Sequence, residues 1–123
     1  MSENIDKFGL PSDEYLFEMA NIRKSTSGLP VNIWVSTKTK NHNSVRIKVS
    51  NTYSNAVDPD LSFIMFWDGN DIIISGNTGE LKYKDIESVR LFFKKHISIF
   101  QLLWEKQIDD DEFKRMIKKV SNG

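Results

Sequence analysis

Residues 31–49, VNIWVSTKTKNHNSVRIKV, contain two alternating hydrophobic patterns separated by a polar segment. In both patterns every second residue is a β-branched aliphatic: Val31, Ile33 and Val35, then Val45, Ile47 and Val49. A period of two places alternate side chains on opposite faces of a strand. We therefore expect two neighbouring strands, joined as a long-loop hairpin by the turn-prone residues 37–44, with Trp34, Arg46 and Lys48 on the face away from the core.

The sheet is expected to continue toward the C-terminus. Residues 61–67, LSFIMFW, are apolar at both parities, a pattern that predicts a strand covered on both faces. The turn signal DGN at 68–70 and the β-branched run DIIIS at 71–75 predict a hairpin to one further short strand. The strands together would form a small antiparallel sheet of about four strands.

Helical periodicity replaces alternation from Tyr83 onward. Apolar residues recur every three or four positions, namely Ile86, Val89, Phe93, Ile97, Phe100 and Trp104. This spacing predicts one long amphipathic helix packed on the sheet. A shorter helix is expected to begin in DDDEF at 109–113, where acidic residues suit the positive helix end, and another in SDEYLFEMANIR at 12–23, capped by Ser12. The fold class is therefore α+β, with two layers.

Length and composition indicate one ordered domain. The chain has 123 residues, 39% of them hydrophobic, and no cysteine that could form a disulfide or a thiolate site. The acidic N-terminus has no apolar region typical of a secretory signal, and no apolar run reaches the length of a membrane span. We expect a cytoplasmic protein with an acidic extension at residues 1–18 and a single domain at residues 19–123.

Charges are segregated along the chain although the net charge is zero. Residues 1–18 carry −4, residues 19–57 carry +6 with no acidic residue, residues 58–81 carry −5 with no basic residue, and residues 82–123 carry +3. Such blocks indicate either a functional patch or oppositely charged segments that lie side by side in the fold.

Motifs for common chemistries are missing from the sequence. It has no glycine-rich phosphate loop, no Gly-x-Ser-x-Gly elbow and no paired histidines for zinc. Its two histidines, His42 and His96, are expected to lie at the surface, and the acidic clusters at 58–60, 68–71 and 109–112 are explained by turns and a helix start. We therefore expect no catalytic residues, no metal ligands and no cofactor.

The basic segment is the best candidate for a binding site. Its candidate residues combine aromatic and cationic side chains: Trp34, Lys38, Lys40, Arg46, Lys48 and Tyr53. Surfaces of aromatic residues and arginine are typical protein interfaces, and cationic grooves with aromatic platforms also suit single-stranded nucleic acid. A non-enzymatic protein-binding module is the leading hypothesis; a nucleic-acid binder, a small hydrolase or nuclease based on His42, and internal pairing of the basic block with residues 58–81 remain alternatives. A second copy of the chain is a further candidate partner.

Three stretches carry a resemblance to a family: MANIRKSTSGLPVNIWVS, VRIKVSNTYSN and FFKKHISIFQLLWEKQIDDDEF. Together they resemble an uncharacterised family of small bacterial and prophage proteins, over about residues 19–120. The resemblance implies an α+β fold with Arg46 and Lys48 in a family-like strand, and it implies that residues 1–18 extend beyond the usual family start. It implies no activity.

Overall fold

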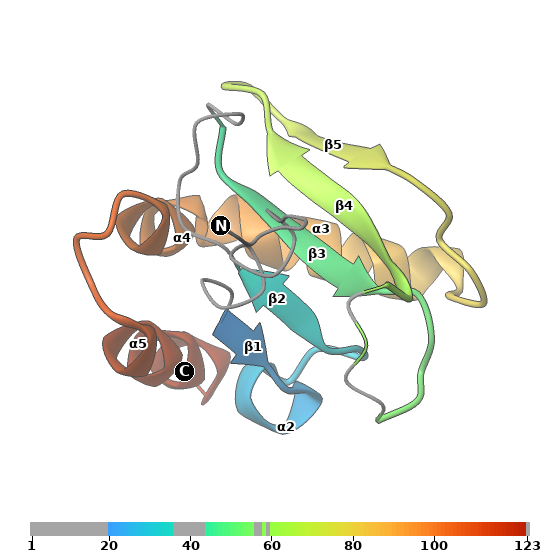
Figure 1. Cartoon of the computed structure of the whole chain (residues 1–123), viewed down its shortest axis with the longest axis horizontal. Helices are drawn as coiled ribbons and strands as arrows, with labels where there is room; N and C mark the ends of the chain where they lie inside the picture. The colour runs from blue at the N-terminus through green and yellow to red at the C-terminus, as the bar shows by residue number, and fades with distance from the viewer. Residues whose placement is uncertain (1–19, 36–43, 56–57, 59, 123) are drawn as a thin grey trace, which may run out of the picture.

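A computed structural model describes residues 20–35, 44–55, 58 and 60–122. Its elements are β1 (Ala20–Ile22), α2 (Lys24–Ser27), β2 (Ile33–Val35), β3 (Arg46–Ser50), β4 (Ser62–Trp67), β5 (Ile72–Ser75), α3 (Tyr83–Lys95), α4 (Ile97–Trp104) and α5 (Asp110–Asn122). The strands form one antiparallel sheet in the order β1-β2-β3-β4-β5, in which every strand pairs with its neighbour in sequence (Figure 1). The fold is α+β, as the order of patterns predicted.

The helices cover one face of the sheet. In Figure 1, α3 and α4 run behind the strands, and α5 lies beside α4 near the β1 edge. The core between these layers contains the inward residues of every strand, including Ile33, Ile47 and Met65, each at most 1% exposed. Phe100 of α4 joins this core through edge-on ring contacts with Phe93 at 4.9 Å and with Phe113 at 5.2 Å between ring centroids. The alternation in residues 31–49 therefore marked the buried face correctly.

The start of α5 is explained by its acidic sequence. The Asp109 carboxylate accepts a hydrogen bond from the Glu112 amide at 2.8 Å, and the Asp109 carbonyl accepts one from the Phe113 amide at 2.9 Å. The Asp109 side chain thus satisfies an amide that would otherwise lack an intrahelical partner. Asp110, Asp111 and Glu112 occupy the first turn, where negative charge is favourable.

The sheet has one strand more than predicted. Residues 20–22 form β1, whose residues Ala20 and Ile22 are buried against the core, whereas the sequence pattern had assigned them to a helix beginning at Ser12. Residues 12–19 of that helix lie outside the described residues. Pairing with β2 accounts for the change, because the ladder satisfies the backbone of a segment too short to be a stable helix alone.

The long helix predicted from Tyr83 to Trp104 is two helices. His96 separates α3 from α4 with φ −110° and ψ 26°, which lies outside the helical region. The apolar spacing continues through the break because both helices bury residues on the same core. Strand β4 also differs from prediction: Phe63 and Met65 are buried, but Ile64 and Phe66 on its other face are only half-buried. The sheet therefore has a second, partly accessible face.

Candidate interaction surface

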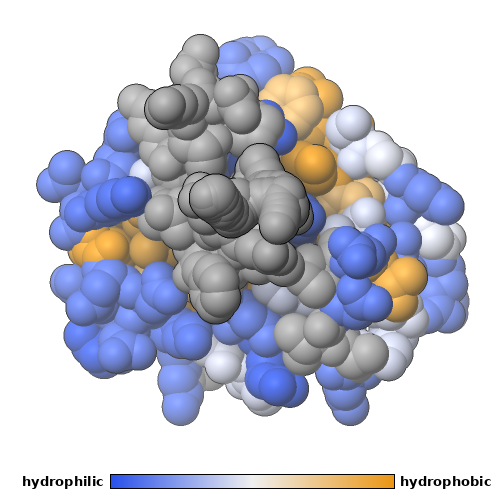
Figure 2. All heavy atoms as spheres, viewed as in Figure 1, coloured by the Kyte–Doolittle hydropathy of each residue, from blue (hydrophilic) through white to orange (hydrophobic). Residues whose placement is uncertain are grey.

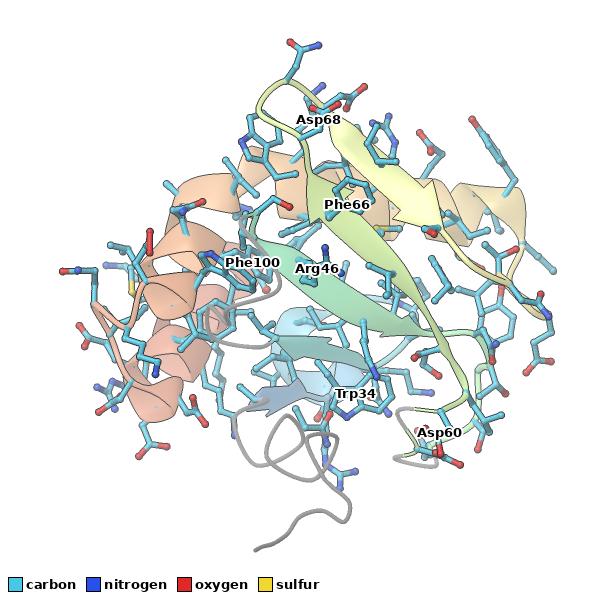
Figure 3. All side chains as sticks on the ribbon, turned by 45° about the horizontal axis from the view of Figure 1, so that its top comes forward. Trp34, Arg46, Asp60, Phe66, Asp68 and Phe100 are labelled. Atoms are coloured by element: carbon cyan, nitrogen blue, oxygen red, sulfur yellow. The ribbon has the colours of Figure 1, made fainter. Side chains whose placement is uncertain are left out.

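Two rows of side chains that point away from the helices contain the predicted strand residues of the candidate site. Residues directly opposite each other on paired strands project to the same face, and the pairing aligns Asn21, Trp34, Lys48, Ile64 and Ser75 in one row and Arg46, Phe66 and Ile73 in the other. We call these eight residues the outer face. Figure 3 shows Trp34, Arg46 and Phe66 following one another across β2, β3 and β4.

Trp34 lies on the outer face as predicted, but it is not solvent-exposed. Only 4% of Trp34 is exposed, although it does not belong to the core cluster between the sheet and the helices. Its position within the sheet contributes to this burial: β1 pairs outside β2, so Asn21 flanks Trp34 on one side and Lys48 on the other. The expectation that an indole ring would be presented to a partner is wrong.

Arg46 is the central cation of the outer face. Its guanidinium carbon lies 5.7 Å from the centroid of the Phe66 ring, within the range of a cation–π interaction. Its Nε atom is buried and has no hydrogen-bond acceptor in the part of the chain that the structure describes. The same is true of Asn21 Oδ1, which has no donor among the described residues. Two buried polar atoms without described partners thus lie on one face of the sheet.

Hydrophobic residues lie beside Arg46 and Lys48 on the outer face. Ile73 on β5 is 39% exposed, and Ile64 and Phe66 on the neighbouring strand β4 are half-buried. In Figure 2, hydrophobic side chains are visible between hydrophilic ones on this side of the molecule. The sequence pattern did not single out these residues: residues 61–67 were predicted to be covered on both faces, and Ile73 was assigned only to the short strand that follows. The parity of these residues relative to Arg46 would have identified them once the strand order was known.

Asp68 and Asp71, two residues of the acidic block at 58–81, are engaged away from the outer face. Asp71 pairs with Arg90 of α3 at 3.1 Å and with Lys94 at 3.2 Å, while the Asp68 carboxylate accepts hydrogen bonds from the Asn70 and Asp71 amides. The amide hydrogen bonds lower the pKa of Asp68, and the Ile72 amide together with Lys94 lowers the pKa of Asp71. In the pairing of β3 with β4, Arg46 lies opposite Phe66 and Lys48 opposite Ile64. Cross-strand pairing therefore does not match the acidic block to the basic strand.

Tyr53 does not lie on the outer face. Its hydroxyl donates a hydrogen bond to the Asp85 carboxylate at 2.5 Å and accepts one from the Lys82 amide at 2.9 Å, so it is bound to the first turn of α3. The hydrogen bond to Asp85 raises the pKa of Tyr53. Its amide donates to Glu80, and the Thr52 hydroxyl also donates to Glu80 and lowers the pKa of that carboxyl. These contacts give Tyr53 a clear structural role in joining the end of β3 to α3.

The remaining candidates separate into two groups. Lys38, Lys40 and His42 lie outside the described residues. His96, predicted to be a surface residue, is partly buried at the break between α3 and α4, where its ring contacts Phe92 edge-on at 4.8 Å. Burial and the neighbouring charge of Lys95 lower the pKa of His96.

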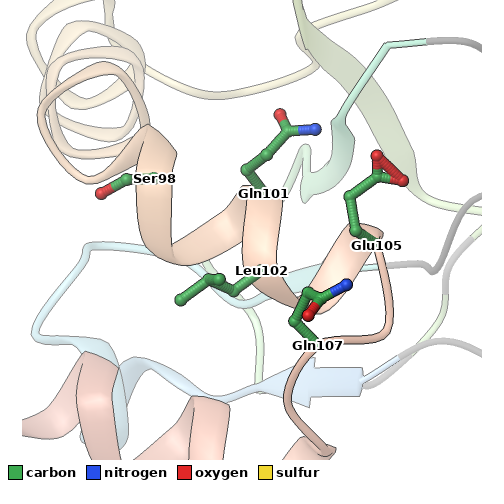
Figure 4. A pocket seen from close by; sticks show the side chains of 5 residues that line it. All are labelled: Ser98, Gln101, Leu102, Glu105 and Gln107. Carbon is green, nitrogen blue, oxygen red and sulfur yellow. The ribbon is translucent and has the colours of Figure 1, made fainter.

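A shallow depression lies beside α4 and the turn that follows it (Figure 4). Its volume is about 410 Å³, and it is lined by Ser98, Gln101, Leu102, Glu105 and Gln107. None of these lining residues offers an activated nucleophile with an adjacent base, which nucleophilic catalysis requires. Within the described residues no group of His, Asp and Glu side chains could hold a metal ion. None of the helices that the structure describes is both long and apolar enough to cross a lipid bilayer.

Comparison with known proteins found no matching family model, no matching curated protein and no matching solved structure. The resemblance to small bacterial and prophage proteins therefore stays a prediction.

Proposed function

We propose that this chain is a non-enzymatic binding module that holds another protein on its outer face. The partner segment would be acidic and apolar, because the outer face combines the cations Arg46 and Lys48 with the hydrophobic residues Ile64, Phe66 and Ile73 and includes no carboxylate. The observation that carries the proposal is the placement of Arg46 over Phe66 beside exposed Ile73. Arginine and aromatic residues are enriched among the anchors of protein interfaces.

Burial of Trp34 favours a protein partner over single-stranded nucleic acid. Nucleic-acid binding to a sheet uses exposed aromatic rings on which bases stack. Trp34 is 4% exposed, Tyr53 is bound to α3, and the ring of Phe66 is in contact with Arg46. An apolar side chain can pack on Ile64 and Ile73 without such a platform, while a carboxylate of the same segment pairs with Arg46.

The test uses three probes of different chemistry and two variants. A short synthetic peptide that alternates Glu with Leu, Phe and Tyr is titrated into the isotopically labelled protein, and amide shifts are followed by NMR. We expect shifts at Arg46, Phe66 and Ile73. Arg46→Glu with Lys48→Glu should weaken binding at least about tenfold, or about 1.4 kcal/mol, because an attractive pair becomes a repulsive one.

Arg115→Glu with Lys118→Glu is the matched control, since it makes the same charge change at exposed positions of α5. Its affinity for the peptide should equal that of the wild type. The second probe is the same peptide with Lys in place of Glu, and the third is a single-stranded oligothymidylate. Shifts only with the oligonucleotide, weakened by salt, would replace the proposal by nucleic-acid binding; no shift on the outer face with any probe would overturn it.

A further inference from the structure

We infer that the outer face is occupied in the isolated protein by the chain's own residues 1–19. These residues would hold the face until a partner segment of the same chemistry displaces them. The inference concerns regulation of the proposed binding surface. Only its consequence, that residues 1–19 compete with a partner for the outer face, rests on the proposed function.

Residues 1–19 have the chemistry that the outer face lacks. Residues 1–18 carry a net charge of −4, and the last eight of the nineteen contain Asp13, Glu14 and Glu18 around the apolar run Tyr15–Phe17. The outer face offers Arg46 and Lys48 beside Ile64, Phe66 and Ile73. The carboxylates and apolar side chains of residues 1–19 are thus complementary to the cations and apolar side chains of the outer face. Charged pairs of this kind specify register, and apolar burial supplies affinity.

The segment ends next to the face. Met19 immediately precedes Ala20 of β1, and Asn21 belongs to the first row of the outer face. Neighbouring strands are about 4.8 Å apart, so β3 lies about 10 Å and β5 about 19 Å from β1. An extended chain spans about 3.3 Å per residue, so Glu18 and Asp13 can reach about 10 Å and about 26 Å from Asn21. Acidic and aromatic residues of the segment therefore reach every strand of the outer face.

The unsatisfied polar atoms support an occupant with hydrogen-bonding groups. Asn21 Oδ1 and Arg46 Nε are buried without partners among the described residues, and both residues belong to the outer face. Leaving a buried donor or acceptor unpaired costs about 1–3 kcal/mol, more for a charged group. A segment that places carboxylates and backbone amides over β1–β3 can supply these partners. A purely apolar partner has no polar groups with which to form these hydrogen bonds.

Tethering makes the competition effective. A segment linked to its site through a short connection is present at an effective concentration of roughly millimolar. If the segment holds the face about nine-tenths of the time, the apparent Kd of a competing peptide rises about tenfold. Partner binding would then be controlled by whatever alters the charge or availability of residues 1–19.

The experiment measures occupancy in the full chain without any partner. Because the sequence has no cysteine, Ser12→Cys introduces a single site for a nitroxide spin label. Paramagnetic broadening of NMR signals is expected at Ile64, Phe66 and Ile73 and not at the outward residues Arg115 and Lys118 of α5. Glu14→Lys with Glu18→Lys should abolish the broadening, and this variant alters no residue that the structure describes.

Two further variants make the result specific. Glu3→Lys with Asp6→Lys makes the same charge change farther from β1 and should leave most of the broadening. Arg46→Glu with Lys48→Glu should abolish it, and combining that variant with Glu14→Lys and Glu18→Lys should restore it, because the charges are exchanged rather than lost. If the outer face shows no broadening, or if Glu14→Lys with Glu18→Lys leaves the broadening unchanged, the inference is overturned.

The acidic peptide separates this inference from the proposed function. If both hold, Glu14→Lys with Glu18→Lys lowers the apparent Kd of the peptide by up to about tenfold. Broadening without peptide binding to either protein would sink the proposed function and leave occupancy standing. Equal peptide affinity for both proteins, without broadening, would sink the inference and leave the binding surface standing.

Discussion

Gly79 is the residue at which backbone conformation and packing together restrict the sequence most. It has φ +60°, and a Cβ atom there would lie 2.4 Å from the Asn51 carbonyl oxygen. The same carbonyl accepts a hydrogen bond from the Glu80 amide at 3.1 Å, so the strand end and the loop before α3 are in direct contact. Glu80 in turn receives the Thr52 hydroxyl and the Tyr53 amide. This close approach therefore positions the segment that joins the sheet to α3.

Gly79→Ala should lower the free energy of unfolding by about 2–5 kcal/mol. A left-handed conformation costs a non-glycine residue about 1–2 kcal/mol, and forced repacking adds about 1–3 kcal/mol. The measurement is urea denaturation followed by circular dichroism. Gly28→Ala is the control: its φ is +77°, but nothing lies within 4 Å of the added carbon. Its cost should be about 0.5–1.5 kcal/mol, since alanine also restricts the unfolded chain. Equal losses in the two variants would show that contact with Asn51 is unimportant.

At the scale of the elements, the break at His96 shapes the helical layer. The His96 amide still donates to the Phe92 carbonyl at 3.0 Å, and the Ile99 amide donates to the His96 carbonyl at 2.9 Å, so hydrogen bonding continues while the direction changes. Beyond the break, α4 contacts both β2 and α5. Phe100 packs between Phe93 and Phe113.

The partial burial of His96 predicts a pH dependence of stability. Burial and Lys95 lower the pKa of His96 in the folded state, so the unfolded state binds the proton first. Stability should therefore fall as pH drops below about 6.5, the ordinary histidine value, and level off once the folded-state histidine is also protonated. Urea midpoints between about pH 8 and about pH 5.5 measure this loss before most carboxyl groups titrate.

His96→Gln should remove the part of the pH dependence that lies in this range. His42→Gln is the matched control, because it replaces the other histidine of the chain, and it should leave that dependence in place. If His96→Gln and the wild type have the same pH dependence, the folded protein does not disfavour the imidazolium.

At the scale of the whole molecule, the strand order makes β3 the centre of the sheet. It pairs with β2 on one side and β4 on the other, and Ile47 and Val49 are at most 1% exposed. The edge strands β1 and β5 each pair on one side only within the described sheet. Elements with fewer pairing partners open locally at lower free energy than the centre.

Native-state hydrogen exchange should reflect this order. Amides of Ile47 and Val49 should exchange only through global unfolding, with a free energy that matches the denaturation value. Those of Ile73 and Ser75 should exchange at least about tenfold faster. A β5 as protected as β3 would mean that something covers the β5 edge, and a β3 that opens locally would contradict its central position.

Periodicity in the sequence predicted most of the described elements and only part of the candidate site. The parity of residues 31–35 and 45–49 identified the inward residues and placed Trp34, Arg46 and Lys48 on the opposite face, as the register has them. Strand β1 could not be predicted, because three residues do not establish a period, and its pairing with β2 contributes to the burial of Trp34. The break at His96 was missed because the apolar spacing continues through it.

The sequence by itself determined the α+β class, the buried faces of β2 and β3, and the start of α5, since these depend on local periodicity and capping. Only the tertiary structure decided which side chains share the outer face. Membership of that face depends on strand order and register, which bring Arg46 opposite Phe66 across twenty residues of chain. Burial is likewise a property of neighbours, so the exposure of Trp34 could not be known before the strands on both sides of it were in place.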